Sequence, residues 1–237
     1  MTRGKLLATA QNANVTDCNV AVAIQRPISV SSDQYRVLFA KVDLHCRTEG
    51  KKVVAVTSAV KGEGKTTTVS NMAVVAARDF GKRCLLVDGD FKNPSIHKFF
   101  NVTEETGLVD VVTRRCPLEN AMKRGPVENL TLLTMGYRPE KENRIWTSET
   151  IREVLKALRG WFDYVLIDAP PVLPLVDMNL IGELADGVLV VVRSGVTEEA
   201  LLAQAVKSLG APKIIGNVLN GVKHEWPSRY YHQYGYY

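Results

Sequence analysis

Short apolar runs alternate with helical stretches along the chain from about residue 50 onward. The apolar runs have the length of strands and fall at 53–56, 84–87, 130–133, 164–167, 188–192 and 214–219. Most are rich in Val, Ile and Leu without polar alternation, as is typical of strands buried on both faces of a sheet. Helical stretches lie near 66–79, 147–159, 176–184 and 197–209. The pattern predicts an α/β fold with a doubly wound, mostly parallel sheet.

Both ends of the chain depart from this alternation. Residues 1–30 are polar and aperiodic, which predicts a flexible N-terminal arm. A helix is expected after the arm, capped by Ser31, Ser32 or Asp33. Residues 223–237 hold almost no aliphatic side chains, so we expect a tail that builds no core of its own. The main domain is therefore predicted at 31–222.

Composition and charge narrow the range of partners. With 237 residues, 46% of them hydrophobic and 23% charged, the chain is long enough for one α/β domain with a full core. The net charge of +5 is modest and spread along the chain, so we expect no nucleic-acid partner. The four cysteines lack metal or redox spacing. No run approaches the roughly 20 apolar residues that cross a bilayer, and we expect a cytoplasmic protein.

The strongest local signal follows the first apolar run. This signal is the segment 59–66, which fits the pattern of the phosphate-binding loop with Ala59 in place of the first Gly. Gly62 and Gly64 let successive N–H groups point at phosphate oxygens, and the next helix adds its N-terminal dipole. Lys65 is expected to reach the β- and γ-phosphates of ATP, and Thr66 to offer its hydroxyl to Mg²⁺. The predicted nucleotide contacts are Ala59, Val60, Lys61, Gly62, Glu63, Gly64, Lys65, Thr66 and Thr67.

Acidic residues end two of the predicted strands. Asp168 follows the run 164–167 and precedes two prolines, at the sheet edge where ligands bind in open α/β folds. Asp88 and Asp90 end the run 84–87 and occupy alternate positions. Two carboxylates side by side repel unless a cation lies between them, and Mg²⁺ is the cation expected beside ATP. These residues are predicted to complete a Mg-ATP site.

Together these motifs resemble those of the bacterial tyrosine kinases (BY-kinases), P-loop proteins of the deviant Walker group. The likeness lies in 59–66, 87–94, 165–171 and the tyrosine-rich 230–237, and it covers about residues 31–237. The resemblance implies catalytic roles for Lys65, Asp88 and Asp90. It also implies that Thr66, Asp88 and Asp168 hold Mg²⁺. Asp88 and Asp90 are both candidates to accept the proton of the substrate tyrosine.

The same resemblance implies a function and its partners. The chain is expected to be an ATP-dependent protein-tyrosine kinase that regulates exopolysaccharide or capsule synthesis or export. The expected activator is the cytoplasmic tail of a membrane protein similar to the polysaccharide co-polymerases. That partner would recruit the kinase to the inner face of the cell membrane, and self-association is expected as well.

Two positions depart from the family pattern. The self-association motif E-x-x-R-x-x-R is matched by Asp33 and Arg36, but Phe39 stands where the second Arg is expected. This removes a donor that could pair bidentately with a neighbour's carboxylate. Lys92 stands where an Arg is usual, which keeps the charge and loses the planar fork. A ring of the family type is therefore less strongly predicted.

Tyrosines are concentrated at the end of the chain. Beside an ATP site they are expected to be phosphate acceptors, whereas an RNA-stacking tail would interleave basic residues, which are absent after Arg229. A tail of about fifteen residues spans some 50 Å at 3.3–3.6 Å per residue, enough to enter its own or a neighbour's active site. The predicted acceptors are Tyr230, Tyr231, Tyr234, Tyr236 and Tyr237.

Two other functions fit part of the pattern. Partition and septum-positioning ATPases resemble the chain in the phosphate loop, but they carry a signature lysine where this sequence has Val60. Lys61 comes one place later. A nucleotide-binding scaffold with little catalysis, tuned by a partner, is the third alternative.

Overall fold

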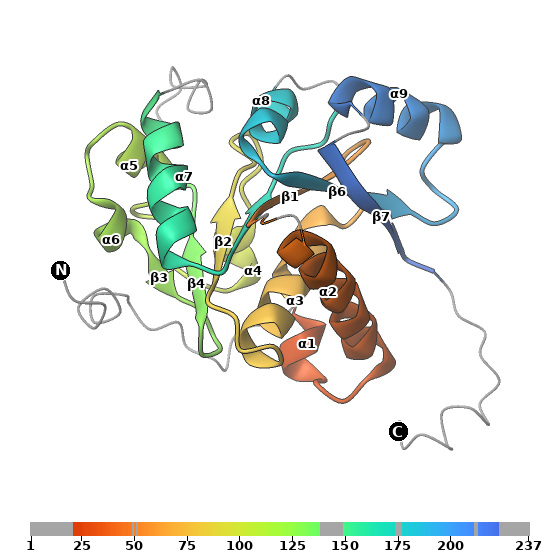
Figure 1. Cartoon of the computed structure of the whole chain (residues 1–237), viewed down its shortest axis with the longest axis horizontal. Helices are drawn as coiled ribbons and strands as arrows, with labels where there is room; N and C mark the ends of the chain where they lie inside the picture. The colour runs from red at the N-terminus through yellow and green to blue at the C-terminus, as the bar shows by residue number, and fades with distance from the viewer. Residues whose placement is uncertain are drawn as a thin grey trace.

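A single, mostly parallel sheet forms the centre of the molecule (Figure 1). The computed structural model describes residues 21–48, 50, 52–137, 149–173, 177–210 and 213–222. Within them the strand order is β3-β4-β2-β5-β1-β6-β7, and only β3 runs antiparallel to its neighbour. The strands are β1 Val53–Ser58, β2 Cys84–Asp88, β3 Lys123–Arg124, β4 Leu130–Leu133, β5 Tyr164–Asp168, β6 Gly187–Arg193 and β7 Ile214–Asn220. The predicted doubly wound α/β fold is confirmed.

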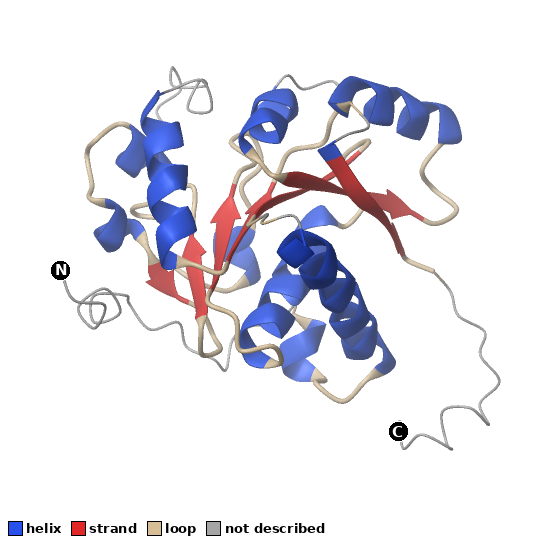
Figure 2. Cartoon of the chain, in the orientation of Figure 1, coloured by secondary structure: helices blue, strands red, loops and turns tan. Residues whose placement is uncertain are grey.

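Helices cover both faces of the sheet (Figure 2). One face carries α1 Val22–Gln25, α2 Val30–Thr48, α3 Lys65–Arg78 and α4 Ile96–Phe99. The other carries α5 Leu108–Val112, α6 Leu118–Ala121, α7 Glu149–Trp161, α8 Asp177–Leu184 and α9 Glu199–Leu209. Successive residues of a strand enter opposite cores: Val54 and Val56 pack with α2 and α3, whereas Val53 and Ala55 pack on the other side. Burial on both faces explains why these strands lack polar alternation.

The strand order brings the ends of three strands together. β5 lies between β1 and β2, although both of those strands precede it in the chain. In the parallel register, Asp168 is the partner of Val56 on one side and of Asp88 on the other. The loops after β1, β2 and β5 therefore leave the sheet at one edge, where ligands bind in folds of this kind.

The structured part of the chain begins earlier than predicted. Residues 21–30 were expected in a flexible arm, yet Ala21 and Ala23 are fully buried, and the Ala23 N–H donates to Asn71 Oδ1 of α3 at 2.9 Å. The helix α2 also starts earlier, because the hydroxyl of Ser29, rather than one at 31–33, accepts the Ser32 N–H at 3.2 Å. Two small apolar residues among polar neighbours give too weak a pattern to reveal this packing. Residues 1–20 and 223–237 lie outside the described residues.

The segment that resembles a self-association motif is engaged within the molecule. Phe39 is fully buried and packs edge-on against Phe80 and Tyr164, with ring centroids 4.9 and 5.3 Å away. Arg36 is paired with Asp33, donates to Asp79 Oδ2 at 2.8 Å, and donates to the Pro27 carbonyl at 2.9 Å. Position 39 thus serves the core, and Arg36 fastens α2 to its own domain.

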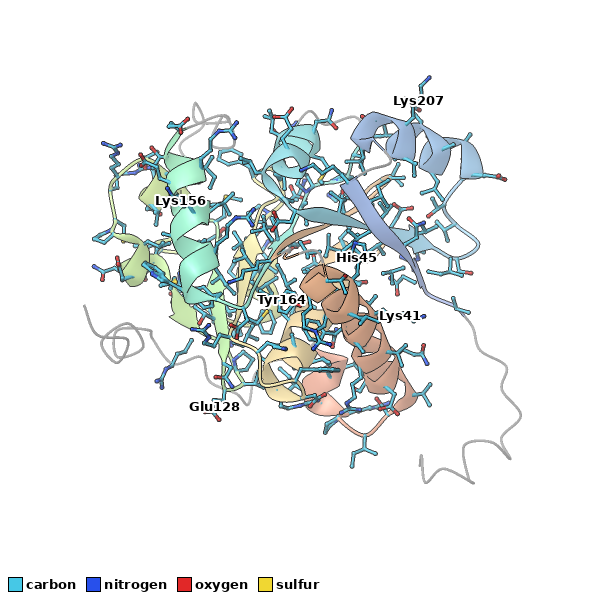
Figure 3. The ribbon with its side chains drawn as sticks, in the orientation of Figure 1. Lys41, His45, Glu128, Lys156, Tyr164 and Lys207 are labelled. Atoms are coloured by element: carbon cyan, nitrogen blue, oxygen red, sulfur yellow. The ribbon has the colours of Figure 1, made fainter. Side chains whose placement is uncertain are left out.

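A second polar contact fastens α2 to the sheet. Tyr164, at the start of β5, lies in the interior beside this helix (Figure 3), and its hydroxyl donates to Asp43 Oδ1 at 2.8 Å.

In the part of the chain that the structure describes, no helix has the length and apolar character needed to cross a bilayer.

Candidate active site

The phosphate loop joins the end of β1 to the start of α3. Gly62 and Gly64 have φ angles of +89° and +95°, in the left-handed region that favours glycine. At Gly64 an added Cβ would also lie 2.0 Å from Asn220 Nδ2, so close approach as well as backbone conformation requires glycine. Lys65 and Thr66 open α3 directly after this turn, and Lys65 is buried. This is the geometry of a loop whose N–H groups and helix terminus receive an anion.

Thr66 and Asp168 meet at the base of the site. The Thr66 hydroxyl donates to Asp168 Oδ2 at 2.6 Å and lies 3.0 Å from the hydroxyl of Ser95. The loop threonine and the acid at the end of β5, each predicted to hold Mg²⁺, are therefore in direct contact. Ser95, which the sequence did not single out, belongs to the same cluster because it lies just beyond the loop that follows β2.

Asp88 and Asp168 form a buried pair of carboxyl groups. Asp88 Oδ2 accepts the N–H groups of Ser95 and Ile96 at 2.9 and 3.0 Å. Within the described part of the chain, Asp88 Oδ1 and Asp168 Oδ1 are buried without a hydrogen-bond partner. Burial and the charge of Asp168 raise the pKa of Asp88. Burial raises the pKa of Asp168 to about 6, opposed by the hydrogen bond from Thr66 and the charge of Lys65.

Unpartnered oxygens beside a hydroxyl fit a divalent cation. Mg²⁺ in nucleotide sites takes one or two carboxylates together with substrate phosphates and waters, and leaving buried polar atoms unpaired is otherwise costly. Thr66, Asp88 and Asp168 offer this set of oxygen donors. The three residues predicted to hold Mg²⁺ are thus brought together, because Thr66 donates to Asp168 and Asp168 is the sheet partner of Asp88.

Asp90 lies in the loop just after β2 and is also buried. Its Oδ1 accepts the backbone N–H of Asn93 at 3.0 Å, which closes the loop after β2 into a turn. Asn93 Oδ1 in turn accepts a hydrogen bond of 3.2 Å from Lys61 Nζ of the phosphate loop. The two loops therefore touch across the entrance to the site.

The chain matches a family model described as AAA domain over residues 51–209. The tyrosine-protein kinase YwqD of Bacillus subtilis is 34% identical over 218 residues, which cover 91% of this chain and 90% of that protein. The chain belongs to the bacterial tyrosine-protein kinase family. The chain under study also matches the succinoglycan biosynthesis transport protein ExoP of Rhizobium meliloti, at 27% identity. The match covers 91% of this chain but only 29% of ExoP.

Solved structures agree with the family assignment. The BceF tyrosine kinase domain superposes on the kinase with a TM-score of 0.78 and 31% identity, covering 86% of this chain and 82% of that one. The cell division ATPase MinD of Pyrococcus furiosus gives a TM-score of 0.60 at 24% identity, covering 71% of each chain. That second likeness shows a shared P-loop fold alone.

In the kinase, the last two strands hold the phosphate loop in shape. Glu63 is 1% exposed, and its carboxylate accepts the Val60 N–H at 2.9 Å and the hydroxyl of Thr197. Arg193 Nη1 donates to the Gly62 carbonyl at 2.9 Å, and Asn220 Nδ2 donates to the Glu63 carbonyl at 2.9 Å. Neither Arg193 nor Thr197 was singled out from the sequence, and no pattern in the sequence linked Asn220 to the loop.

Substituting Thr197 by Val tests this support. The isosteric change removes one donor from a buried carboxylate, a loss typically worth about 1.5–3 kcal/mol, and should loosen the loop. We expect the kinase to bind Mg-ADP about tenfold more weakly in calorimetric titrations. Thr48→Val, at the exposed end of α2, is the matched control and should bind as the parent does. Equal affinities for the two variants would contradict the role of Thr197.

Proposed function

We propose that the chain binds Mg-ATP in this site and transfers the γ-phosphoryl group to tyrosines, including those of its own tail. The observation that carries the proposal is the buried pair Asp88 and Asp168 with its unpartnered oxygens, beside Thr66 at the end of the phosphate loop. The names of the relatives, tyrosine-protein kinases over most of the chain, support the same activity.

The transfer exchanges one P–O bond for another. The phenol oxygen of the acceptor bonds to the γ-phosphorus, the bond from that phosphorus to the β–γ bridging oxygen breaks, and ADP leaves with the electron pair. The transition state is loose, so positioning and charge stabilisation contribute more than early deprotonation of the phenol. Loop N–H groups and Lys65 would orient the phosphates. A bound Mg²⁺ would neutralise negative charge on the transferred group.

Asp90 suits the role of proton acceptor better than Asp88. Asp88 Oδ2 is committed to two backbone N–H groups, and its other oxygen lies in the buried pair. Asp90 lies two residues later in the loop after β2; its Oδ1 accepts the backbone N–H of Asn93, and its other oxygen would receive the phenol proton. The phenol proton, with an ordinary pKa of about 10, would pass to this carboxylate as the P–O bond forms.

The tail and a membrane partner complete the proposal. β7 ends at Asn220, whose side chain donates to the phosphate loop, two residues before the described range ends at 222. The five acceptor tyrosines themselves lie outside the described residues. ExoP is a succinoglycan biosynthesis transport protein, which supports a role in polysaccharide synthesis or export under a membrane-protein activator. Each phosphate adds about −1.5 to −2 charges and would weaken docking to acidic surfaces.

Mass-spectrometric mapping of phosphate tests the function. The full chain is incubated with Mg-ATP, alone and with the cytoplasmic segment of a candidate activator. We expect phosphate on Tyr230–Tyr237, none there when all five tyrosines are Phe, and none in Lys65→Met. A phosphorylated fraction per minute that rises with enzyme concentration would mean transfer between molecules. ATP hydrolysis without phosphotyrosine, even with activator, would instead indicate a switch ATPase.

A further inference from the structure

Lys61 is a second cationic residue of the phosphate loop that the proposed chemistry leaves without a role. Its side chain is exposed, and its ammonium group donates to Asn93 Oδ1 at 3.2 Å. Asn93 lies in the turn closed by Asp90. The ammonium group therefore extends from the loop that would hold the phosphates toward the loop that carries the proposed proton acceptor.

The backbone on both sides of Lys61 is held in place. The Val60 N–H donates to Glu63 Oε2 at 2.9 Å, and the Val60 carbonyl accepts the Ser58 hydroxyl at 2.6 Å. On the other side, the Gly62 carbonyl accepts a bond from Arg193 at 2.9 Å. Three hydrogen bonds thus fix the point from which the Lys61 side chain starts. Only its flexible stem has to move for the ammonium group to change partners.

The charge of the site favours such a change of partner. Asp88 and Asp168 end β2 and β5, Asp90 follows β2, and Lys65 is a buried cation whose charge acts on Asp168. The present acceptor of Lys61 is a neutral amide oxygen. An ionised phosphate oxygen makes a shorter bond, roughly twice as strong, so it would displace the amide when a triphosphate enters.

We propose that Lys61 binds the γ-phosphate of ATP, acting within its own chain as a cationic finger across the entrance of the site. This rests on the proposed function for the identity of the nucleotide. The site supplies from position 61 a cation comparable to those that P-loop enzymes bring to the transferred group in cis or in trans. In the nucleotide-free protein, the bond to Asn93 holds the ammonium group against the turn that Asp90 closes.

Comparing ATP with ADP tests the contact directly. Binding of Mg-ATP and Mg-ADP is measured by calorimetry for the full chain and for Lys61→Met, Lys61→Arg and Asn93→Ala. Lys61→Met should weaken Mg-ATP by about tenfold or more, since one charge-assisted bond is lost, and change Mg-ADP less than about twofold. Lys61→Arg should keep most of the preference for ATP. Lys207→Met, on the outer side of α9 (Figure 3), is the charge-matched control and should change neither affinity.

Asn93→Ala distinguishes phosphate binding by Lys61 from a purely structural role of the hydrogen bond between Lys61 and Asn93. It leaves the ammonium group and removes only its partner, so Mg-ATP affinity should stay within about twofold of the parent value. Equal losses in Lys61→Met and Asn93→Ala, or equal losses for ATP and ADP, would overturn the proposal. The ATP-to-ADP ratio needs no catalysis: if the parent forms no phosphotyrosine, the kinase assignment fails while the ratio still decides the role of Lys61.

Discussion

Replacing Asp168 by Asn should stabilise the nucleotide-free protein at neutral pH while lowering tyrosine phosphorylation by about a thousandfold or more. The two effects have one cause. Asp168 is 1% exposed and faces Asp88 across paired strands, so two buried carboxyl groups oppose each other until a cation arrives. An amide cannot ionise, which removes the repulsion and, with it, a ligand for the cation.

The pKa of Asp168 gives the sign of the pH dependence. Burial raises it from the ordinary 3.8 to about 6 in the folded protein. Between these values the folded chain binds more protons than the unfolded chain, so the free energy of unfolding falls as pH rises through this window. A shift of this size corresponds to about 3 kcal/mol at neutral pH. The advantage of Asp168→Asn should therefore be largest above the window and vanish below it.

Thermal unfolding of the parent and Asp168→Asn at about pH 4 and about pH 7.5, with and without Mg-ADP, checks this prediction. The variant should melt higher than the parent at the upper pH without ligand, and Mg-ADP should raise the melting temperature of the parent more. Asp163→Asn is a control in which the substitution should lower the free energy of unfolding instead of raising it. Its pKa is lowered by the hydrogen bond from Arg83, and the pair is more than a third exposed, so a loss below about 1 kcal/mol is expected. If the variant melted at a lower temperature than the parent at both pH values, repulsion between the carboxyl groups of Asp88 and Asp168 would not destabilise the nucleotide-free protein.

Introducing the arginine of the self-association motif, by Phe39→Arg, should destabilise the fold by at least about 4 kcal/mol. Phe39 is 0% exposed between Phe80 and Tyr164, and α2 presents this position to the sheet. A guanidinium group there would be buried without a carboxylate partner among aromatic rings. Urea unfolding measures the loss.

Val37→Arg is the matched control for Phe39→Arg. Val37 lies on the same helix and is 49% exposed, so the same new side chain should change stability by no more than about 0.5 kcal/mol. Phe39→Leu, which keeps the apolar character, should cost far less than Phe39→Arg. If Phe39→Arg unfolded at the urea concentration of the parent, α2 would have to present position 39 to solvent or to a second copy.

The repeated strands and helices, the phosphate loop and the acids at the strand ends could all be predicted from the amino-acid sequence. These features are local: buried strands require continuous apolar runs, and a phosphate loop requires glycines, lysine and threonine at set spacings. The predicted helices and strands at 66–79, 84–87 and 164–167 differ from α3, β2 and β5 by no more than a residue at either end.

Which distant residues share the site depends on how the strands and helices pack together. Asp88 and Asp168 face each other because β5 enters the sheet between β1 and β2, and Asn220 reaches the loop carbonyl of Glu63 from 157 residues away. The burial of Phe39 and the packing of Ala21 and Ala23 depend likewise on surfaces supplied by other elements. Such contacts follow from pairing between strands and helices far apart in the chain, and no local periodicity encodes which of them become neighbours.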